Sequence, residues 1–348
     1  QDVNLNAPNG ETCIYLVHQD WGDCYTNVFP TREEVESYAT KLRLISGRPL
    51  DEANPILDTE LEVENFAARV SAITAPLSPL GLGFSFRRHR NFPWTFPLYM
   101  QPKIKYMNVM CAGLLNFLIE NNATILVAGT RSSGKSSLLG SFLTEMSRRS
   151  RILTIEDTFE LPSKALRDLG YNIEQLKVAS ALSSKDSSEV DPSIGIRSTL
   201  RLGDSAIYVG EVRSHEAIAL FEAMRVGAAA NVVAGTIHAD SPYGVYDRVV
   251  NDIGVPKTSF KAIDIIVITN PVISGLKKYK RILKITEVRK DWENDPLNEG
   301  GFVDLMVYNP ATDELEITDD LINGNSEIIK RMAGCLLYTS PSPRDEKV

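Results

Sequence analysis

Hydrophobic and polar positions divide the chain into a mixed N-terminal region and a longer region in which strands and helices alternate. In residues 1–85, short apolar runs flank an amphipathic helix that we expect to open at a capping box of Thr31 and Glu34. Beyond an apolar helix at 106–120, five apolar segments predict strands at 124–128, 151–155, 206–209, 231–236 and 265–269. Helical patterns separate these segments, which is typical of βαβ units and a mostly parallel sheet. The predicted fold class is therefore α/β.

Three stretches interrupt or extend this pattern. Residues 86–105 contain Pro93, Pro97 and Pro102 and predict an extended linker between a domain at 1–85 and a domain at 106–333. Segments 281–288 and 302–307 predict an antiparallel extension of the sheet. Residues 334–348 break off a helical pattern and resemble translated sequencing-adapter read-through, so we expect an artefactual tail there. Because the first residue is Gln1 rather than Met, we expect the N-terminal domain to be truncated at its start.

The acidic charge of the chain is concentrated near its N-terminus. The 348 residues include 37 Lys and Arg against 45 Asp and Glu, a net charge of −8. Residues 1–85 hold 5 basic and 13 acidic side chains, so the remainder is balanced. An acidic total argues against a general nucleic-acid binder, which normally presents a basic surface. Residues 86–105, with five basic side chains and no acidic one, form a basic strip in the expected linker.

Cysteine usage and hydropathy indicate the compartment. Cys13, Cys24, Cys111 and Cys335 are scattered, and no two of them form a CxxC pair. This spacing excludes the usual zinc-ribbon arrangement and offers no disulfide framework, so we expect a reducing cytoplasmic compartment. No apolar run in the sequence approaches the ~18 residues of a membrane span.

A glycine-rich segment follows the first strand of the longer region. Residues 129–136, GTRSSGKS, match the pattern G-x-x-x-x-G-K-[ST]. Such a loop lets successive backbone N–H groups surround a phosphate at the N-terminus of a helix, where the helix dipole favours anions. Lys135 would neutralise the β- and γ-phosphates, and the Ser136 hydroxyl would ligate Mg²⁺. The residues expected to bind nucleotide are Gly129, Thr130, Arg131, Ser132, Ser133, Gly134, Lys135, Ser136 and Ser137.

Polar side chains also follow three other predicted strands. Glu156 and Asp157 come directly after one strand, and Glu211 follows the next strand along the chain. His238 follows the strand after that. Ligands of open α/β sheets bind at the carboxyl ends of the strands, where a carboxylate can orient water or Mg²⁺ and an imidazole can donate to a γ-phosphate. Each side chain alone is more often a cap or a solvated loop residue, but three strand ends together favour a site.

The order of these segments resembles that of the secretion-superfamily ATPases, the hexameric motors of type II and type IV secretion, type IV pili and the archaellum. Segments 129–136, 155–157, 210–217 and 235–240 look like that family's Walker A, Asp box, Walker B and His box. Segments such as 54–58 and 200–205 are most similar to the archaeal branch. The resemblance implies a RecA-like P-loop ATPase domain, preceded by a small mixed α/β, PAS-like N-terminal domain and a linker.

The resemblance also implies roles for single residues. Glu211 would be the catalytic glutamate, Glu156 would help to position Mg²⁺ or water, and His238 would sense the γ-phosphate. Ser136, Glu156 and Glu211 are therefore the expected metal ligands. Arginines that neutralise charge in the transition state are expected at Arg87 in the basic strip, and at Arg197, Arg201 and Arg213 around Walker B.

For the whole protein, the resemblance implies a Mg²⁺-dependent ATPase that forms a homo-hexamer. It would work in the cytoplasm, at the inner face of the membrane. Its partners would be a polytopic membrane platform protein and, indirectly, pilin-like subunits, and no nucleic acid is expected. Whether it would drive secretion, pilus extension, retraction or archaellum rotation stays open.

Three alternatives also stay open. A DNA translocase or helicase on the same core would need a basic pore, and DNA would stimulate its ATPase activity. A small-molecule kinase shares the glycine-rich loop, but it would transfer phosphate to an acceptor other than water. A nucleotide-gated structural subunit would bind nucleotide without turnover, and a phosphate-release assay would distinguish it.

Overall fold

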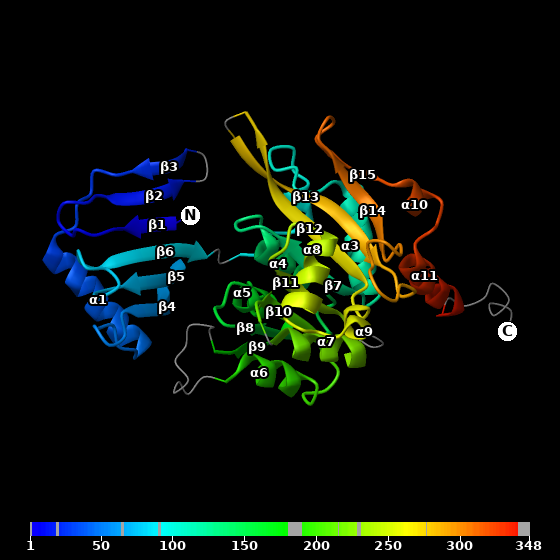
Figure 1. The fold of residues 1–348 in the computed structure, drawn as a ribbon, viewed down its shortest axis with the longest axis horizontal. Helices are drawn as coiled ribbons and strands as arrows, with labels where there is room; N and C mark the ends of the chain where they lie inside the picture. Colours follow the sequence, from blue (N-terminus) through cyan, green and yellow to red (C-terminus); the bar gives the residue numbers. More distant parts are fainter. Residues whose placement is uncertain are drawn as a thin grey trace. The chain divides into compact units, whose positions relative to one another are not determined.

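The computed structural model describes residues 2–18, 21–63, 66–89, 92–179, 190–214, 216–227, 231–275 and 277–339. These residues form two compact units, which divide between residues 92 and 93 (Figure 1). Each unit has its own sheet and its own hydrophobic core. In these ranges no helix combines the length and the apolar character that crossing a membrane requires.

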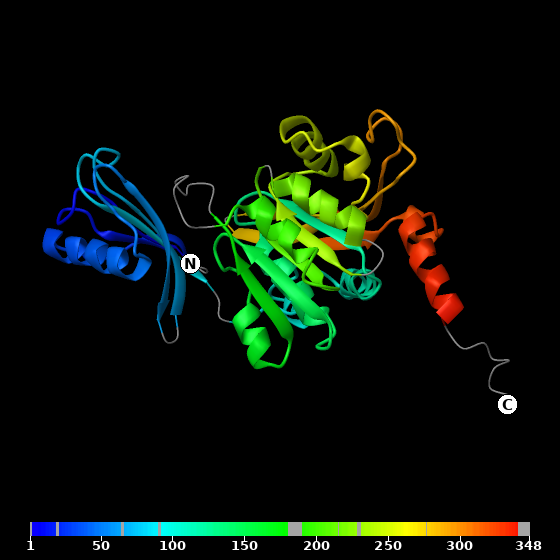
Figure 2. The same ribbon diagram turned by 90° about the horizontal axis from the view of Figure 1, so that it is seen from below.

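Unit 1, the N-terminal unit, is an antiparallel sheet with a helix packed on one face (Figure 2). Its strands, in the spatial order β3-β2-β1-β6-β5-β4, are β1 (Asp2–Leu5), β2 (Ile14–His18), β3 (Gly22–Tyr25), β4 (Ile56–Val63), β5 (Phe66–Ile73) and β6 (Gly83–His89). Helix α1 (Arg32–Ser46) opens at the predicted capping box of Thr31 and Glu34. The α1 residues in the core of this unit are Val35, Ala39 and Leu42. Their spacing of three and four residues is that of a single helix face.

Unit 2 is built on one large, mostly parallel sheet. Its strands are β7 (Thr124–Gly129), β8 (Arg151–Glu156), β9 (Asn172–Lys177), β10 (Ala206–Val212), β11 (Val233–Ile237), β12 (Ile265–Ser274), β13 (Lys277–Val288), β14 (Phe302–Asn309) and β15 (Glu314–Ile317). Their spatial order is β15-β14-β13-β12-β7-β11-β10-β8-β9, and the six strands from β12 to β9 run parallel. The remaining three add an antiparallel extension, as the sequence predicts. The predicted α/β fold class is confirmed.

Helices cover both faces of this sheet. They are α2 (Phe96–Tyr99), α3 (Val109–Glu120), α4 (Lys135–Glu145), α5 (Ser163–Asp168), α6 (Pro192–Thr199), α7 (Glu216–Gly227), α8 (Pro242–Tyr246), η1 (Asp247–Asp252, a π-helix), α9 (Lys257–Phe260), α10 (Asp319–Ile322) and α11 (Glu327–Thr339). Alternate residues of the central strands enter two separate cores. In β7, Ile125 and Val127 pack with α3 and α4, whereas Leu126 and Ala128 pack with α6 and α7. Because the strands are buried on both faces, their ends provide a firm support for loops.

The segment 86–105, expected to be a linker, consists partly of regular structure. β6 runs to His89, so Arg87 and Arg88 belong to the sheet of unit 1. Further along, α2 forms within the same segment. The register places Arg87 opposite Asp2 of β1, and the two residues are 85 positions apart in the sequence. Local sequence patterns do not identify a pairing partner that distant. The linker expected from residue 86 therefore begins inside β6, which ends at His89.

At the other end, α11 continues past residue 333, where we expected the interpretable sequence to stop. The helix reaches Thr339, and its residues Ile328 and Met332 are buried in the core that contains α3 and α4. Part of the expected artefactual tail is therefore helical. Residues 340–348 lie outside the described residues.

Candidate nucleotide-binding site

The glycine-rich segment forms a tight turn between β7 and α4. β7 ends at Gly129, and α4 begins at Lys135. Gly134 has a φ of 101°, a conformation that residues with a side chain rarely adopt. A Cβ on Gly129 would lie only 2.0 Å from the carbonyl oxygen of Thr269. Both glycines are thus required by the local geometry, and the loop ends at the positive end of α4.

Two residues of β12, the neighbour of β7, hold the loop in place. The Asn270 side-chain oxygen accepts hydrogen bonds from the N–H and the hydroxyl of Thr130, at 3.0 and 2.9 Å. The Thr269 hydroxyl donates to Oγ of Ser133 at 2.9 Å. Neither residue is among the predicted site residues. Both are polar residues that directly follow an apolar strand segment, so the signal that identified Glu211 also occurs here.

Lys135 is buried beneath the loop, with 8% of its surface exposed. Its Nζ donates to the carbonyl oxygens of Gly129 and Thr130, at 3.0 and 2.9 Å. Burial lowers the pKa of Lys135, although the charge of Glu211 opposes this effect. A phosphate in the loop would offer the ammonium group a full negative charge in place of the neutral carbonyl groups.

Glu211, near the end of β10, is held by Arg213. The guanidinium donates through Nε to Oε2 of Glu211 at 2.8 Å, and through Nη1 to Oδ2 of Asp157 at 2.9 Å. Burial opposes ionisation of Glu211, but the Arg213 hydrogen bond and the nearby positive charges outweigh it and lower the pKa of Glu211. At neutral pH this side chain is therefore a carboxylate, the form that can accept a proton from water.

His238 connects Lys135 with Glu211. Its Nε2 lies 2.8 Å from Oε1 of Glu211, and its Nδ1 lies 3.3 Å from Nζ of Lys135. Since the two partners are a carboxylate and an ammonium group, we assign the ring proton to Nε2 and acceptance to Nδ1. Burial and the charge of Lys135 lower the pKa of His238, so the ring is neutral at pH 7. Three predicted site residues, from a loop and two strand ends, thus form one contiguous cluster.

Glu156, the last residue of β8, is 2% exposed and lies beside the neighbouring strand β10. Its Oε1 accepts hydrogen bonds from the backbone N–H groups of Glu160 and Leu161, at 2.8 and 2.9 Å. A Cβ on Gly210, the residue before Glu211, would lie 2.9 Å from Cγ of Glu156. Glu156 therefore fixes the turn that follows β8, and its role towards Mg²⁺ or water stays a prediction.

The other predicted arginines have different surroundings from Arg213. Arg197 in α6 pairs through Nε with Glu222 of α7 at 3.2 Å, and its side chain is 57% exposed. Arg201 is exposed just beyond α6. Arg87 belongs to unit 1, where its Nε lies 3.1 Å from Oδ1 of Asp2. The catalytic roles of these three arginines stay predictions.

The residues at this edge of the sheet fit a nucleotide with Mg²⁺. The loop supplies N–H groups, Lys135 supplies a buried charge, and the Ser136 hydroxyl lies in the first turn of α4. In the part of the chain that the structure describes, no three His, Cys, Asp or Glu side chains are placed to hold a metal ion. Mg²⁺ usually takes one or two protein ligands and fills its other positions with phosphate oxygens and water. Ser136 and a strand-end carboxylate are the predicted protein ligands, and this role stays a prediction.

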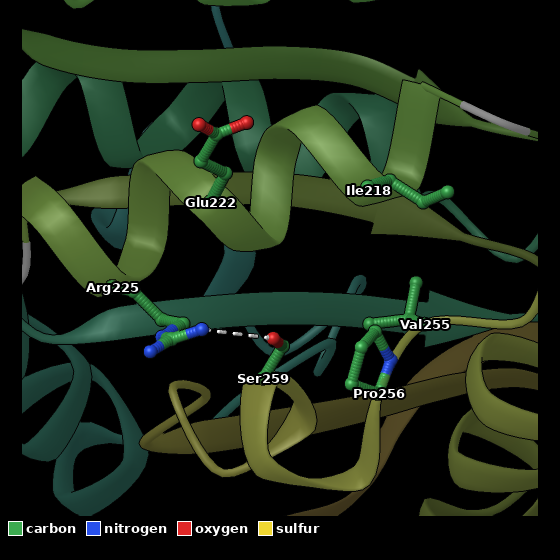
Figure 3. A pocket seen from close by; sticks show the side chains of 6 residues that line it. All are labelled: Ile218, Glu222, Arg225, Val255, Pro256 and Ser259. Atoms are coloured by element: carbon green, nitrogen blue, oxygen red, sulfur yellow. Dashed lines mark hydrogen bonds between the residues drawn. The ribbon is translucent and has the colours of Figure 1, made fainter.

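A cavity of about 430 Å³ lies elsewhere on unit 2, between α7 and α9 (Figure 3). The residues that line it are Ile218, Glu222, Arg225, Val255, Pro256 and Ser259. Within it, the Arg225 guanidinium donates to the Ser259 hydroxyl at 3.5 Å. None of these lining residues belongs to the loop or to the cluster of Lys135, Glu211 and His238.

A phosphate-binding loop between a buried parallel strand and a helix, with an ionised carboxylate on a nearby strand, defines a P-loop nucleotide-binding fold. Residues 59–289, more than half of the chain, match the family described as type II/IV secretion system protein. The chain belongs to this family.

Several curated proteins are similar to the chain. A putative conjugal transfer protein of Mycobacterium tuberculosis is 31% identical over 217 residues, which cover 62% of this chain and 59% of that protein. An uncharacterized protein of the archaeon Methanocaldococcus jannaschii is 27% identical over 293 residues, which cover 83% of this chain and 50% of that protein. The chain thus spans between half and three fifths of the length of these two relatives.

Among solved structures, the ATPase DotB of Legionella pneumophila is similar, with a TM-score of 0.55 and 17% identity over 97% of this chain and 84% of that one. DotB of Yersinia pseudotuberculosis has a TM-score of 0.57 and 15% identity, over 83% of this chain and 76% of that one. At such low identity the likeness shows a shared fold and no more.

Proposed function

We propose that this chain hydrolyses ATP, with Mg²⁺ as its cofactor, as the motor of a type II/IV secretion or type IV pilus-like system. The observation that carries the proposal is the contact of His238 with both Lys135 and Glu211. Through this contact, His238 links Lys135 of the phosphate loop to the ionised carboxylate of Glu211 in β10. A loop that only binds nucleotide has no need of such a carboxylate, whereas hydrolysis requires a group that orients and deprotonates water.

The residues of the cluster divide the chemistry among them. Lys135 neutralises phosphate charge, and Glu211, kept ionised beside Arg213, accepts the proton of the attacking water. His238, with its proton on Nε2, can transfer that hydrogen bond from Glu211 to a phosphate oxygen, and its position then reports whether the γ-phosphate is present. Mg²⁺, when bound at Ser136, would neutralise phosphate oxygens.

For the assembly, we propose a homo-hexameric ring at the cytoplasmic face of the membrane. Arg87, Arg197 and Arg201 are exposed or half-exposed, so they are accessible to nucleotide from another domain or subunit. The ring would act on a polytopic platform protein and, through it, on pilin-like subunits. The secretion family and the conjugal transfer name of one relative support a transport motor.

The test measures phosphate release by the purified chain with ATP and Mg²⁺, compared with Lys135→Ala. Because Lys135 is the buried cation of the loop, we expect nucleotide binding and turnover to be lost. The matched control is Lys330→Ala, at an exposed lysine of α11, and its turnover should equal that of the unaltered chain. Binding of ATP without phosphate release by the unaltered chain would show a nucleotide-gated structural subunit instead.

A DNA translocase is the second candidate, because a relative is named for conjugal transfer. The same assay with added single- and double-stranded DNA decides between the two. Stimulation by DNA that disappears at high salt would favour the translocase, since phosphate contacts are salt-dependent. For the proposed secretion motor we expect no stimulation.

A further inference from the structure

Three aromatic side chains form a stacked row that ends at the phosphate loop. The rings of Trp94 and Tyr99 lie 5.2 Å apart with an interplanar angle of 9°, and those of Tyr99 and Tyr106 lie 4.6 Å apart at 28°. All three belong to unit 2 and pack in the core that contains α3 and α4. Tyr106 is 3% exposed. The row therefore holds the Tyr106 ring in a fixed position.

The hydroxyl at the end of this row contacts the loop backbone. Oη of Tyr106 donates to the carbonyl oxygen of Ser133 at 3.3 Å. The next residue, Gly134, lies so close that a Cβ there would be 3.2 Å from the same Oη. Burial raises the pKa of Tyr106, so the phenol keeps its proton and acts as a donor at any physiological pH.

The direction of one N–H group follows from this contact. A peptide unit is planar and trans, so its C=O and its N–H point in opposite directions. Because the Ser133 carbonyl points to Tyr106, the N–H of Gly134 points away from Tyr106. In a phosphate loop, the N–H groups just before the helix bind phosphate oxygens. A rotated Ser133–Gly134 peptide would present a carbonyl oxygen to the phosphate instead, and the two would repel each other.

We propose that Tyr106 is a positioning residue that fixes the Ser133–Gly134 peptide with its N–H towards the nucleotide phosphate. The role rests on the proposed function, because it presupposes nucleotide in the loop. It also explains why a segment that precedes the first strand of the parallel sheet packs beneath the loop, where sequence patterns predicted only a linker and an apolar helix.

The test is Tyr106→Phe, which keeps the stacked ring and removes only the hydroxyl. We expect the Kd of ADP, measured by displacement of a fluorescent ADP analogue, to rise about three- to tenfold, the effect of losing one neutral hydrogen bond. The Kd of AMP should change less, because AMP has no β-phosphate for the loop to hold. The change in discrimination between ADP and AMP is a result that a general loosening of the fold would not produce.

The matched control is Tyr208→Phe in β10, which removes another fully buried hydroxyl, one without a hydrogen-bond partner among the described residues. The melting temperature of each ligand-free variant shows whether the fold is intact. If Tyr106→Phe and Tyr208→Phe bind ADP and AMP equally well, the positioning role is wrong. If the unaltered chain and Lys135→Ala bind ADP with equal affinity, the proposed function itself fails, so the two failures are distinguishable.

Discussion

The two units each contain an arginine paired with a carboxylate, but the two pairs differ in burial. In unit 2, Arg213 is 31% exposed, and its partners Glu211 and Asp157 are 21% and 20% exposed. In unit 1, Arg87 is 59% exposed, and Asp2 is 29% exposed. An exposed pair contributes about 0–1 kcal/mol to stability, because water screens it. The comparison teaches that Arg213 is held between two partly buried carboxylates, whereas the pair of Arg87 with Asp2 is more exposed and contributes less to stability.

The largest effect is expected at the carboxylate that Arg213 holds. Glu211→Gln keeps the hydrogen-bonding shape but cannot accept a proton, so turnover should fall about 10³-fold. Nucleotide binding should be retained, since Lys135 is unchanged. Phosphate release and displacement of a fluorescent nucleotide measure the two quantities. Glu174→Gln, at an exposed position of β9, is the control. Equal turnover in both variants would contradict the role of Glu211.

The next effect concerns the exposed pair. If Arg87 exchanges Asp2 for nucleotide phosphate, Arg87→Ala should lower turnover about 10²-fold, whereas the free energy of unfolding should change by less than about 1 kcal/mol. Arg69→Ala is a close control, because Arg69 lies directly opposite Arg87 in the register of β5 and β6. A change in turnover no larger than that of Arg69→Ala would make Arg87 an ordinary surface charge.

For the less exposed pair of unit 2, we expect a larger loss of stability. Arg213→Gln leaves the Glu211 and Asp157 carboxylates, both mostly buried, without their shared donor. The free energy of unfolding in urea should fall by about 1–3 kcal/mol, more than for Arg87→Ala. If the two substitutions cost the same, the difference in burial between the pairs has no energetic consequence.

The smallest effect is a pH dependence at Glu211. Its folded pKa lies below the ordinary value of 4.5, so ionised Glu211 stabilises the fold above pH 4.5. That contribution is lost as the pH falls from 4.5 through the folded pKa. The stability difference between the unaltered chain and Glu211→Gln, measured by unfolding in urea, should therefore shrink as the pH falls below 4.5. A difference that grows on acidification would contradict the lowered pKa.

Local patterns in the sequence predict most of unit 2. Apolar strand segments that end in polar residues predict a site that contains the loop, Glu211 and His238. The physical reason is that the carboxyl ends of parallel strands meet at one edge of a sheet. The same signal occurs at Thr269 and Asn270, which are not among the predicted site residues. Tyr106 gives no such signal, since an aromatic residue at the start of an apolar helix usually belongs to the core.

Unit 1 departs from the prediction at β6, which begins before the expected linker and extends into it. β6 joins β1, and Arg87 is opposite a residue 85 positions away. The prolines and arginines of 86–105 indicated a linker, whereas strand pairing placed Arg87 and Arg88 on a sheet. Composition cannot distinguish a charged strand face from a charged linker, because both are exposed to water.

The sequence by itself determined the α/β class, the phosphate loop and the residues that follow the parallel strands, because these depend on periodicity and on spacing within a few residues. Only the tertiary structure decided which of them meet. In the folded chain, His238 lies between Lys135 and Glu211. Arg213, and not Arg197, donates to the Glu211 carboxylate. The Tyr106 hydroxyl contacts the Ser133 carbonyl group. Contacts between residues far apart in the chain are selected by the packing of whole strands and helices, and no local pattern records that packing.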